Sequence, residues 1–171
     1  MIIVSDSSTL ILLAKINILK MVHNYYKKVL IPKQVFIETV EIGKEQNKED
    51  ALIIEKEIKD KKIIISEIIN KENLNVILKD FKCNLGEAEM LSLAIDKNAT
   101  LFTDDAEAMK ACRVYDLEFI TALAFLVKLI NDNKIDKEEA LIKFSLLSKL
   151  GYYSKEILNE ALMECNKKWN K

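Results

Sequence analysis

Short apolar runs alternate along the chain with longer stretches of helical periodicity. The short runs are rich in β-branched residues and lie at 2–4, 29–31, 62–66, 100–103 and 117–120. The helical patterns between them lie near 8–26, 32–43, 47–60, 86–98 and 105–113. Runs without polar alternation are typical of strands buried on both faces, so the order of elements predicts an α/β domain with a central parallel sheet and right-handed crossovers.

The remainder of the chain reads as helical, with one segment left open. Residues 121–171 predict three helices, and residues 67–84 form either a helix or an irregular connection. There is no internal repeat and no low-complexity linker, and 171 residues suffice for one domain with its own core. We expect a single domain over 1–171, with a core over about 1–130 and C-terminal helices over about 131–171.

Charge and composition exclude several classes of function. A formal net charge of −1 gives no global basic field, so any contact with nucleic acid must come from a local patch. No apolar run reaches the roughly 18–20 residues of a membrane span, and the N-terminus does not read as a signal peptide. Three scattered cysteines without a CxxC pair favour reduced thiols in a cytoplasm over disulfides or a zinc site.

The histidine content points in the same direction. His23 is the only histidine, and it lies in a helical pattern where we expect a surface or half-buried residue. A single histidine argues against a histidine metal cluster and against a Ser-His-Asp triad. Chemistry in this chain would therefore depend on its acids.

Acidic residues lie where the predicted strands end, at the edge where open parallel sheets place their working residues. Asp6 follows the first strand, Glu38 lies in the helix after the second, Glu87 begins a later helix, and Asp104 and Asp105 follow the run at 100–103. Each has a purely structural alternative, because Asp caps helix N-termini and Asp or Glu is favourable in a first turn.

Helical spacing distinguishes some of these carboxylates from solvated ones. Glu38 shares a predicted face with Val35 and Ile42, on a stripe that otherwise looks buried. Glu87 lines up in the same way with Leu91 and Ala94. Glu89 falls instead on a face with charged neighbours, so Glu87 is the better candidate for an inward carboxylate.

Carboxylates that converge from separate segments repel one another unless a cation lies among them. Oxygen ligands without His or Cys favour Mg²⁺ or Mn²⁺. Such a metal can activate water and stabilise charge on an attacked phosphate. The acids therefore point to a metal-dependent phosphodiester chemistry.

Four segments in order resemble the PIN-domain family of metal-dependent ribonucleases, which includes many toxins of toxin–antitoxin pairs. They are VSDSSTLILLAKI, IPKQVFIETV, LGEAEMLSLAIDKNATLFTDDAEAMKAC and FITALAFLVKL, and they cover about residues 1–130. They are most similar to a prokaryotic branch with a GExEA-type third motif and a double-Asp fourth motif. The resemblance implies a three-layer α/β/α sandwich with a parallel sheet of about four or five strands and a helical C-terminal tail.

The resemblance also assigns roles to residues. Its first acid falls on Asp6, its second on Glu38, its third on Glu87 and its fourth on Asp104 or Asp105. Of these, Asp6, Glu87, Asp104 and Asp105 would bind Mg²⁺ or Mn²⁺, and all five carboxylates would be catalytic. The small polar residues that support the water at the metal would be Ser7 and Thr103.

Two positions depart from the pattern of this branch. Residues 120–124 read ITALA where relatives often carry a glycine-bearing turn, and Met109 stands where they often carry Arg. Local basic residues for an RNA backbone would be Lys15, Lys110 and Arg113, although a solvated helix face is the plainer interpretation of each. The departures bear on contacts to the substrate more than on the metal site.

The resulting hypothesis is a cytoplasmic Mg²⁺/Mn²⁺-dependent endoribonuclease, with RNA as substrate, an antitoxin protein and a second copy of the chain as implied partners, and no membrane association. The alternative is a non-catalytic PIN-like interaction or RNA-binding protein. A haloacid-dehalogenase-like phosphatase ranks lower because Ser8 stands where that fold needs a second Asp. A receiver domain ranks lower because the run at 62–66 supplies no Asp.

Overall fold

The structure, a computed structural model that describes residues 1–81 and 83–169, is built on a parallel sheet of five strands in the order β3-β2-β1-β4-β5. The strands are β1 (Ile2–Ser5), β2 (Lys28–Ile31), β3 (Ile63–Ile65), β4 (Thr100–Phe102) and β5 (Phe119–Ile120). All five apolar runs in the sequence are thus strands. The α/β class and the parallel sheet predicted from the sequence are confirmed.

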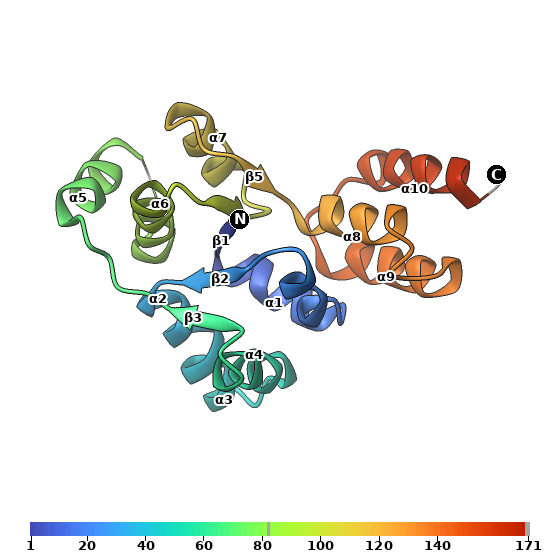
Figure 1. Ribbon diagram of the computed structural model, residues 1–171, viewed down its shortest axis with the longest axis horizontal. Helices are drawn as coiled ribbons and strands as arrows, with labels where there is room; N and C mark the ends of the chain where they lie inside the picture. Colours follow the sequence, from blue (N-terminus) through green and yellow to red (C-terminus); the bar gives the residue numbers. More distant parts are fainter. Residues whose placement is uncertain (82, 170–171) are drawn as a thin grey trace. The chain divides into compact units, whose positions relative to one another are not determined.

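Helices cover both faces of this sheet and make it the middle of three layers (Figure 1). One face carries α1 (Ser7–Lys15), α2 (Lys33–Phe36), the π-helical segment η2 (Ile37–Glu41), α3 (Ile42–Glu45) and α4 (Glu49–Lys59). The other face carries α6 (Leu85–Lys97) and α7 (Ala106–Val114), and α5 (Lys71–Asp80) packs against α6. The central strands are therefore buried on both sides, and Ile3, Val4 and Leu101 are fully buried.

One predicted helix is interrupted in the structure, and the segment left open contains a helix. The pattern near 8–26 divides into α1 and a 3-10 helix, η1 (Leu19–Asn24), because the chain turns at Asn17 with a φ of 56°. Asparagine tolerates this left-handed conformation better than most residues. The open segment 67–84 contains a true helix, α5, whose N-terminus is capped by the Asn70 side chain.

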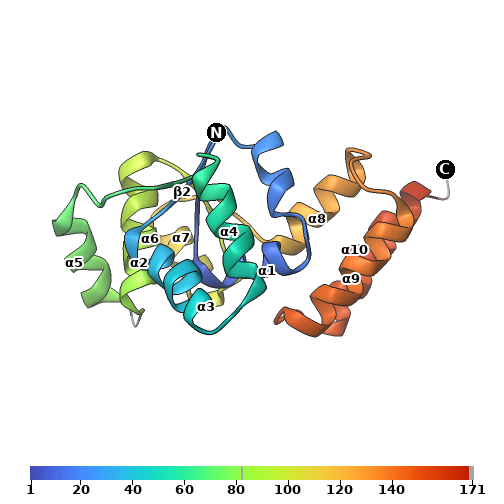
Figure 2. The ribbon, with the colours of Figure 1, turned by 90° about the horizontal axis from the view of Figure 1, so that it is seen from below.

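The chain divides into two compact units, Met1–Ile120 and Thr121–Lys171. The second contains α8 (Ala122–Asn131), α9 (Lys137–Leu150) and α10 (Lys155–Trp169), the three helices predicted for the tail (Figure 2). Within it, the Leu123 backbone N–H donates to the Tyr153 hydroxyl at 3.0 Å. The contacts group α8 with α9 and α10. The single domain over 1–171, with a core over about 1–130, stays a prediction.

The helices of the described ranges also bear on membrane association. None of them is both long and apolar enough to cross a bilayer.

Candidate active site

Asp6 lies at the carboxyl end of the central strand β1 and caps the N-terminus of α1. Its carboxylate accepts hydrogen bonds from the Thr9 backbone N–H at 2.6 Å, from the Ser8 hydroxyl at 3.1 Å and from the Thr103 hydroxyl. The residue is only 7% exposed. Burial raises the pKa of Asp6 above its ordinary value, although these hydrogen bonds lower it in part.

Thr103 connects β1 to the loop after β4. It is fully buried; its hydroxyl donates to Asp6 and accepts from the Asp105 backbone N–H at 3.2 Å. The Asp104 backbone N–H in turn donates to the Thr9 hydroxyl at 2.9 Å. Asp104 and Asp105 are therefore tied to Asp6 and its helix by hydrogen bonds across the sheet edge.

One of the two aspartates of this loop, Asp105, caps a helix. The Asp105 carboxylate caps α7 by accepting from the Ala108 backbone N–H at 2.7 Å. Both residues are half-buried. The cap uses one oxygen of Asp105. It does not decide whether Asp104 or Asp105 is the fourth acid that the resemblance implies.

Glu38 reaches the same edge from the helix that follows β2. The Ser7 hydroxyl donates to one of its carboxylate oxygens, and the Gln34 side-chain amide donates to the other at 2.9 Å. Ser7 directly follows Asp6, so Glu38 is hydrogen-bonded to the residue next to the first acid. Two hydrogen-bonded groups therefore meet at consecutive residues of the chain: Asp6 with Thr103 and the loop at 104–105, and Ser7 with Glu38 of η2.

The helix face predicted for Glu38 is only partly correct. Val35 is buried as expected, but Ile42 is 39% exposed. The reason is the π-helical segment η2, which places one extra residue in the turn and shifts the faces that follow it. The segment holds Glu38 itself, and single π turns inside helices often occur at functional sites.

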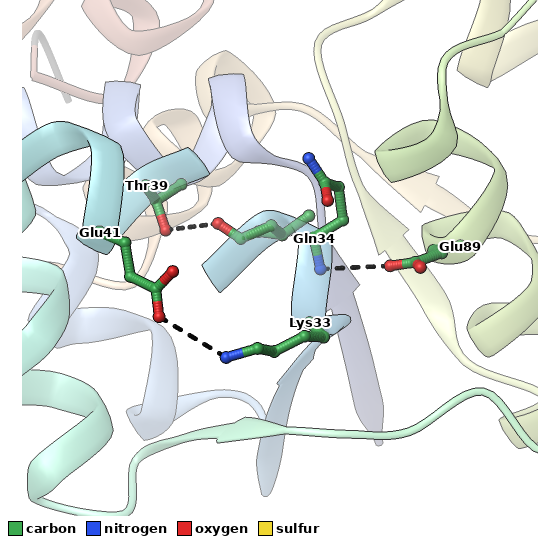
Figure 3. A network of polar contacts seen from close by, with 6 residues as sticks. Lys33, Gln34, Thr39, Glu41 and Glu89 are labelled. Carbon is green, nitrogen blue, oxygen red and sulfur yellow. Dashed lines mark hydrogen bonds and ion pairs between the residues drawn. The ribbon is translucent and has the colours of Figure 1, made fainter. Parts of the chain in front are cut away.

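Glu87 and Glu89 lie on different sides of α6. The Glu87 carboxylate accepts from the Asn84 backbone N–H at 2.9 Å, and the Asn84 side chain accepts from the Glu87 backbone N–H, which makes a reciprocal helix cap. Glu89 accepts from the Gln34 backbone N–H at 3.2 Å, as Figure 3 shows. Gln34 thus joins Glu38 to Glu89, the glutamate that sequence spacing placed on a solvated face.

Gly86 lies where α6 approaches Glu38. A Cβ atom at this position would lie 3.3 Å from the Glu38 carboxylate and 3.4 Å from the Gln34 side chain. The first turn of α6 therefore meets the candidate site through its backbone, and a side chain there would press on Glu38.

The three basic residues considered for RNA contact lie outside these groups. Lys15 lies in the last turn of α1, which Asp6 caps at its other end, and a nine-residue helix is about 13 Å long at ~1.5 Å per residue. Lys110 forms an ion pair with Glu107 on the exposed side of α7. Arg113 is exposed in the last turn of that helix.

The donor atoms at this edge are of the kind that binds a metal ion, but they are not arranged as a metal-binding cluster. Within residues 1–81 and 83–169, no three or more His, Cys, Asp or Glu side chains are grouped so that they could hold a metal. The donors at the edge are carboxylate and hydroxyl oxygens, which Mg²⁺ and Mn²⁺ prefer. Mg²⁺ usually takes one or two protein carboxylates and completes its shell with water, and the buried Asp6 would be one such carboxylate.

Sequence reasoning did not find Thr9, Gln34 or Glu89 among the residues of this network. Thr9 and Gln34 act through hydrogen bonds to partners 95 and 4 residues away. One feature of the sequence could have pointed to this network: the glycine before Glu87 at the start of α6. This residue, Gly86, lies against the Glu38 carboxylate.

Comparison with known proteins adds a family. The chain matches the sequence model of a family described as "DUF3368: PIN domain" over residues 2–167. Among solved structures it is similar to a PilT N-terminus domain protein from the hyperthermophilic archaeon Sulfolobus solfataricus, with 15% sequence identity and a TM-score of 0.47 over 90% of this chain and 97% of that one. A search of curated proteins finds no match.

Proposed function

Because this chain belongs to the PIN-domain family, whose fold is of the nuclease type, we propose that it is a metal-dependent endoribonuclease that hydrolyses RNA phosphodiester bonds. The observation that carries the proposal is the hydrogen bonding of the buried Asp6 to Thr103 and, through Thr103, to the loop at 104–105 at the carboxyl edge of the sheet, with Glu38 bonded to the adjacent Ser7. PIN domains are generally nucleases and commonly use divalent metal ions.

Three positions would hold Mg²⁺ or Mn²⁺: Asp6, Glu38 and the Asp104–Asp105 pair. The Glu38 carboxylate is bonded to Ser7, whereas the Glu87 carboxylate caps α6. These contacts support Glu38 over Glu87 as the metal-binding acid beside Asp6 and the Asp104–Asp105 pair. A metal ion bound by these residues would act as a Lewis acid, which would lower the pKa of water and offset charge on the attacked phosphate.

The chain's own residues would keep the carboxylates in place for that chemistry. Thr103 fixes one oxygen of Asp6, and Ser7 and Gln34 fix the two oxygens of Glu38. Burial of Asp6 excludes water from one side of the site and strengthens its attraction for a cation. RNA is the proposed substrate; an antitoxin and a homodimer stay predictions from the resemblance.

The experiment is metal-dependent cleavage of a single-stranded RNA by the wild-type chain and by Asp6→Asn, with EDTA as the metal-free arm. We expect Asp6→Asn to reduce cleavage at least about 100-fold, the scale of losing one essential electrostatic or acid–base group. Glu107→Gln is the matched control, because Glu107 is an exposed acid in the first turn of α7 with only a lysine partner. Undiminished cleavage by Asp6→Asn would contradict the proposal.

The alternative, a non-catalytic RNA-binding protein with the same fold, is favoured by one observation: the absence of a three-ligand metal cluster in the described part of the chain. A titration of Mg²⁺ and Mn²⁺ followed by thermal unfolding separates the two. A nuclease should gain stability in proportion to RT ln(1 + [L]/Kd), and Asp6→Asn should lose that gain. RNA binding without any metal-dependent shift or cleavage would establish the alternative.

A further inference from the structure

A pocket of about 320 Å³ lies beside the candidate active site, near the carboxyl ends of β2 and β3. Its volume is at the lower end of the roughly 300–1,000 Å³ typical of ligand pockets. It is bounded by α2, by the connection from β3 to α5, by the start of α5 and by α6. Its lining includes Lys33, Ile68, Lys71, Leu74, Asn75 and Glu89. Ser66 and the exposed Glu67 complete the lining, so the two lysines face two glutamates in the pocket as a whole.

One residue joins this pocket to the candidate site. Glu89 in the pocket wall accepts from the Gln34 backbone N–H at 3.2 Å (Figure 3), and the Gln34 side chain donates to Glu38 at 2.9 Å. Gln34 therefore contacts both the pocket wall and a carboxylate of the candidate site. A nucleic-acid strand with one phosphate at the carboxylates would place a neighbouring nucleotide here.

Two lysines supply positive charge to the pocket. Lys33 is 62% exposed, and its ammonium lies 3.6 Å from the half-exposed Glu41 carboxylate (Figure 3). The same ammonium lies 4.5 Å from the centre of the Phe36 ring. An exposed ion pair and an exposed cation–π contact each contribute little, so Lys33 can turn toward a phosphate. Lys71 is exposed at the first position of α5 and forms no ion pair with any described residue.

The rest of the pocket suits a base better than a phosphate. Ile68 and Leu74 are half-buried and pack against the hydrophobic core, which leaves an apolar surface for a ring. Glu89 would repel a phosphate placed against it, whereas its carboxylate can accept from an amino group. Asn75 offers both a donor and an acceptor, the pair that matches an amino group beside a ring nitrogen.

We propose that this pocket binds one nucleotide of a single-stranded RNA substrate, with its phosphate on Lys33 and Lys71 and an adenine or cytosine base on Ile68 and Leu74, read by Asn75. Uracil lacks the amino group and is the disfavoured base. The proposal rests on the proposed nuclease function and adds the place where the strand next to the cut is held. Single strands permit this because their bases are free to leave the stack.

The experiment measures binding apart from cleavage. Fluorescein-labelled ten-nucleotide oligo(A), oligo(C) and oligo(U) RNAs are titrated in EDTA, with anisotropy as the readout, at several salt concentrations. Lys33→Ala and Lys71→Ala should each weaken oligo(A) binding about threefold or more and reduce the slope of log K against log salt by about 0.7. Lys79→Ala is the matched control, since Lys79 is exposed in the last turn of the same helix and should leave both unchanged.

Base preference gives a second readout. The wild-type chain should bind oligo(A) or oligo(C) about fivefold more tightly than oligo(U), and Asn75→Ala should remove that preference. In cleavage assays the lysine variants should raise KM while kcat stays near the wild-type value.

The outcomes separate this proposal from the nuclease function. Cleavage that persists with unchanged KM, affinity and salt slope in both lysine variants would overturn the pocket assignment and leave the nuclease intact. Equal affinity for the three RNAs would overturn the base assignment. Binding with the expected preference and lysine dependence, without cleavage under any metal, would support the pocket and contradict the nuclease.

Discussion

The Thr103 hydroxyl is the contact on which the candidate site most depends, and Thr103→Val tests it. Valine has nearly the shape of threonine, so the substitution removes an oxygen without opening a cavity. In the wild-type chain that oxygen donates to Asp6 and accepts from the Asp105 backbone N–H. Because Thr103 is fully buried, water cannot replace either bond.

The expected cost follows from these two bonds. A hydrogen bond to a charged group contributes about 1.5–3 kcal/mol, and a buried backbone N–H without an acceptor costs about 1–3 kcal/mol. Allowing for relaxation of the loop, we expect the free energy of unfolding to fall by about 3 kcal/mol. In a chain of this length that corresponds to a Tm lower by roughly 6–12 °C.

Urea unfolding and differential scanning calorimetry of the metal-free protein measure the effect. Thr103→Ser keeps the hydroxyl and should lose only about 1 kcal/mol, the order of one buried methyl group. A double-mutant cycle with Asp6→Asn isolates the Thr103–Asp6 contact, and we expect a coupling of at least about 1 kcal/mol.

The alternative result is equally clear. If Thr103→Val unfolds within about 0.5 kcal/mol of wild type, or if the cycle gives no coupling, the hydroxyl does not hold Asp6. The hydrogen-bonded group at the sheet edge would then be no evidence for a constructed site.

Three further predictions concern other residues. Asp6→Asn should raise the free energy of unfolding of the metal-free protein at pH 7.5 by about 1 kcal/mol. Burial raises the folded-state pKa of Asp6, so the stabilising contribution of Asp6 is present below the ordinary value of 3.8 and lost as pH rises. Urea unfolding that shows a loss of stability in Asp6→Asn at both pH 7.5 and pH 4 would refute this. Gly86→Ala should change stability by less than about 1 kcal/mol, because alanine favours the helix, yet reduce cleavage by displacing Glu38; an unchanged rate in a cleavage assay would contradict it. Burial lowers the pKa of His23 despite the Glu57 carboxylate 3.0 Å away, so the free energy of unfolding should fall as pH drops below 6.5. An NMR titration midpoint above 6.5 for this single histidine would show that the charge of Glu57 outweighs burial.

Strands and helix starts could be predicted because their signals are local. The run at 2–4 is β-branched and apolar, and Asp6 directly after it is a common helix-capping residue, so both features follow from a few adjacent positions. Asn17 could not be anticipated as the point where the helix breaks, because its left-handed backbone conformation depends on how the chain turns toward η1.

The carboxylates of α6 show the limit for the site. The predicted spacing placed Glu87 inward, but the structure commits its carboxylate to the cap with Asn84 and turns Glu89 toward Gln34. Periodicity reports which residues share a face of one helix. It does not report which neighbouring backbone N–H lies within reach, and that is what distinguishes these two glutamates.

The extra residue in η2 also governs how this helix tolerates insertion and deletion. Its first half faces α6 through Gln34, and its second half packs on α4, where a Cβ at Gly43 would lie only 2.8 Å from the Ala51 side chain. Each residue turns an α-helix by about 100°, so loss of one residue between 37 and 41 would rotate one half out of register with its neighbour. The length of this segment is therefore under physical constraint of its own, separate from the constraint on the Glu38 side chain.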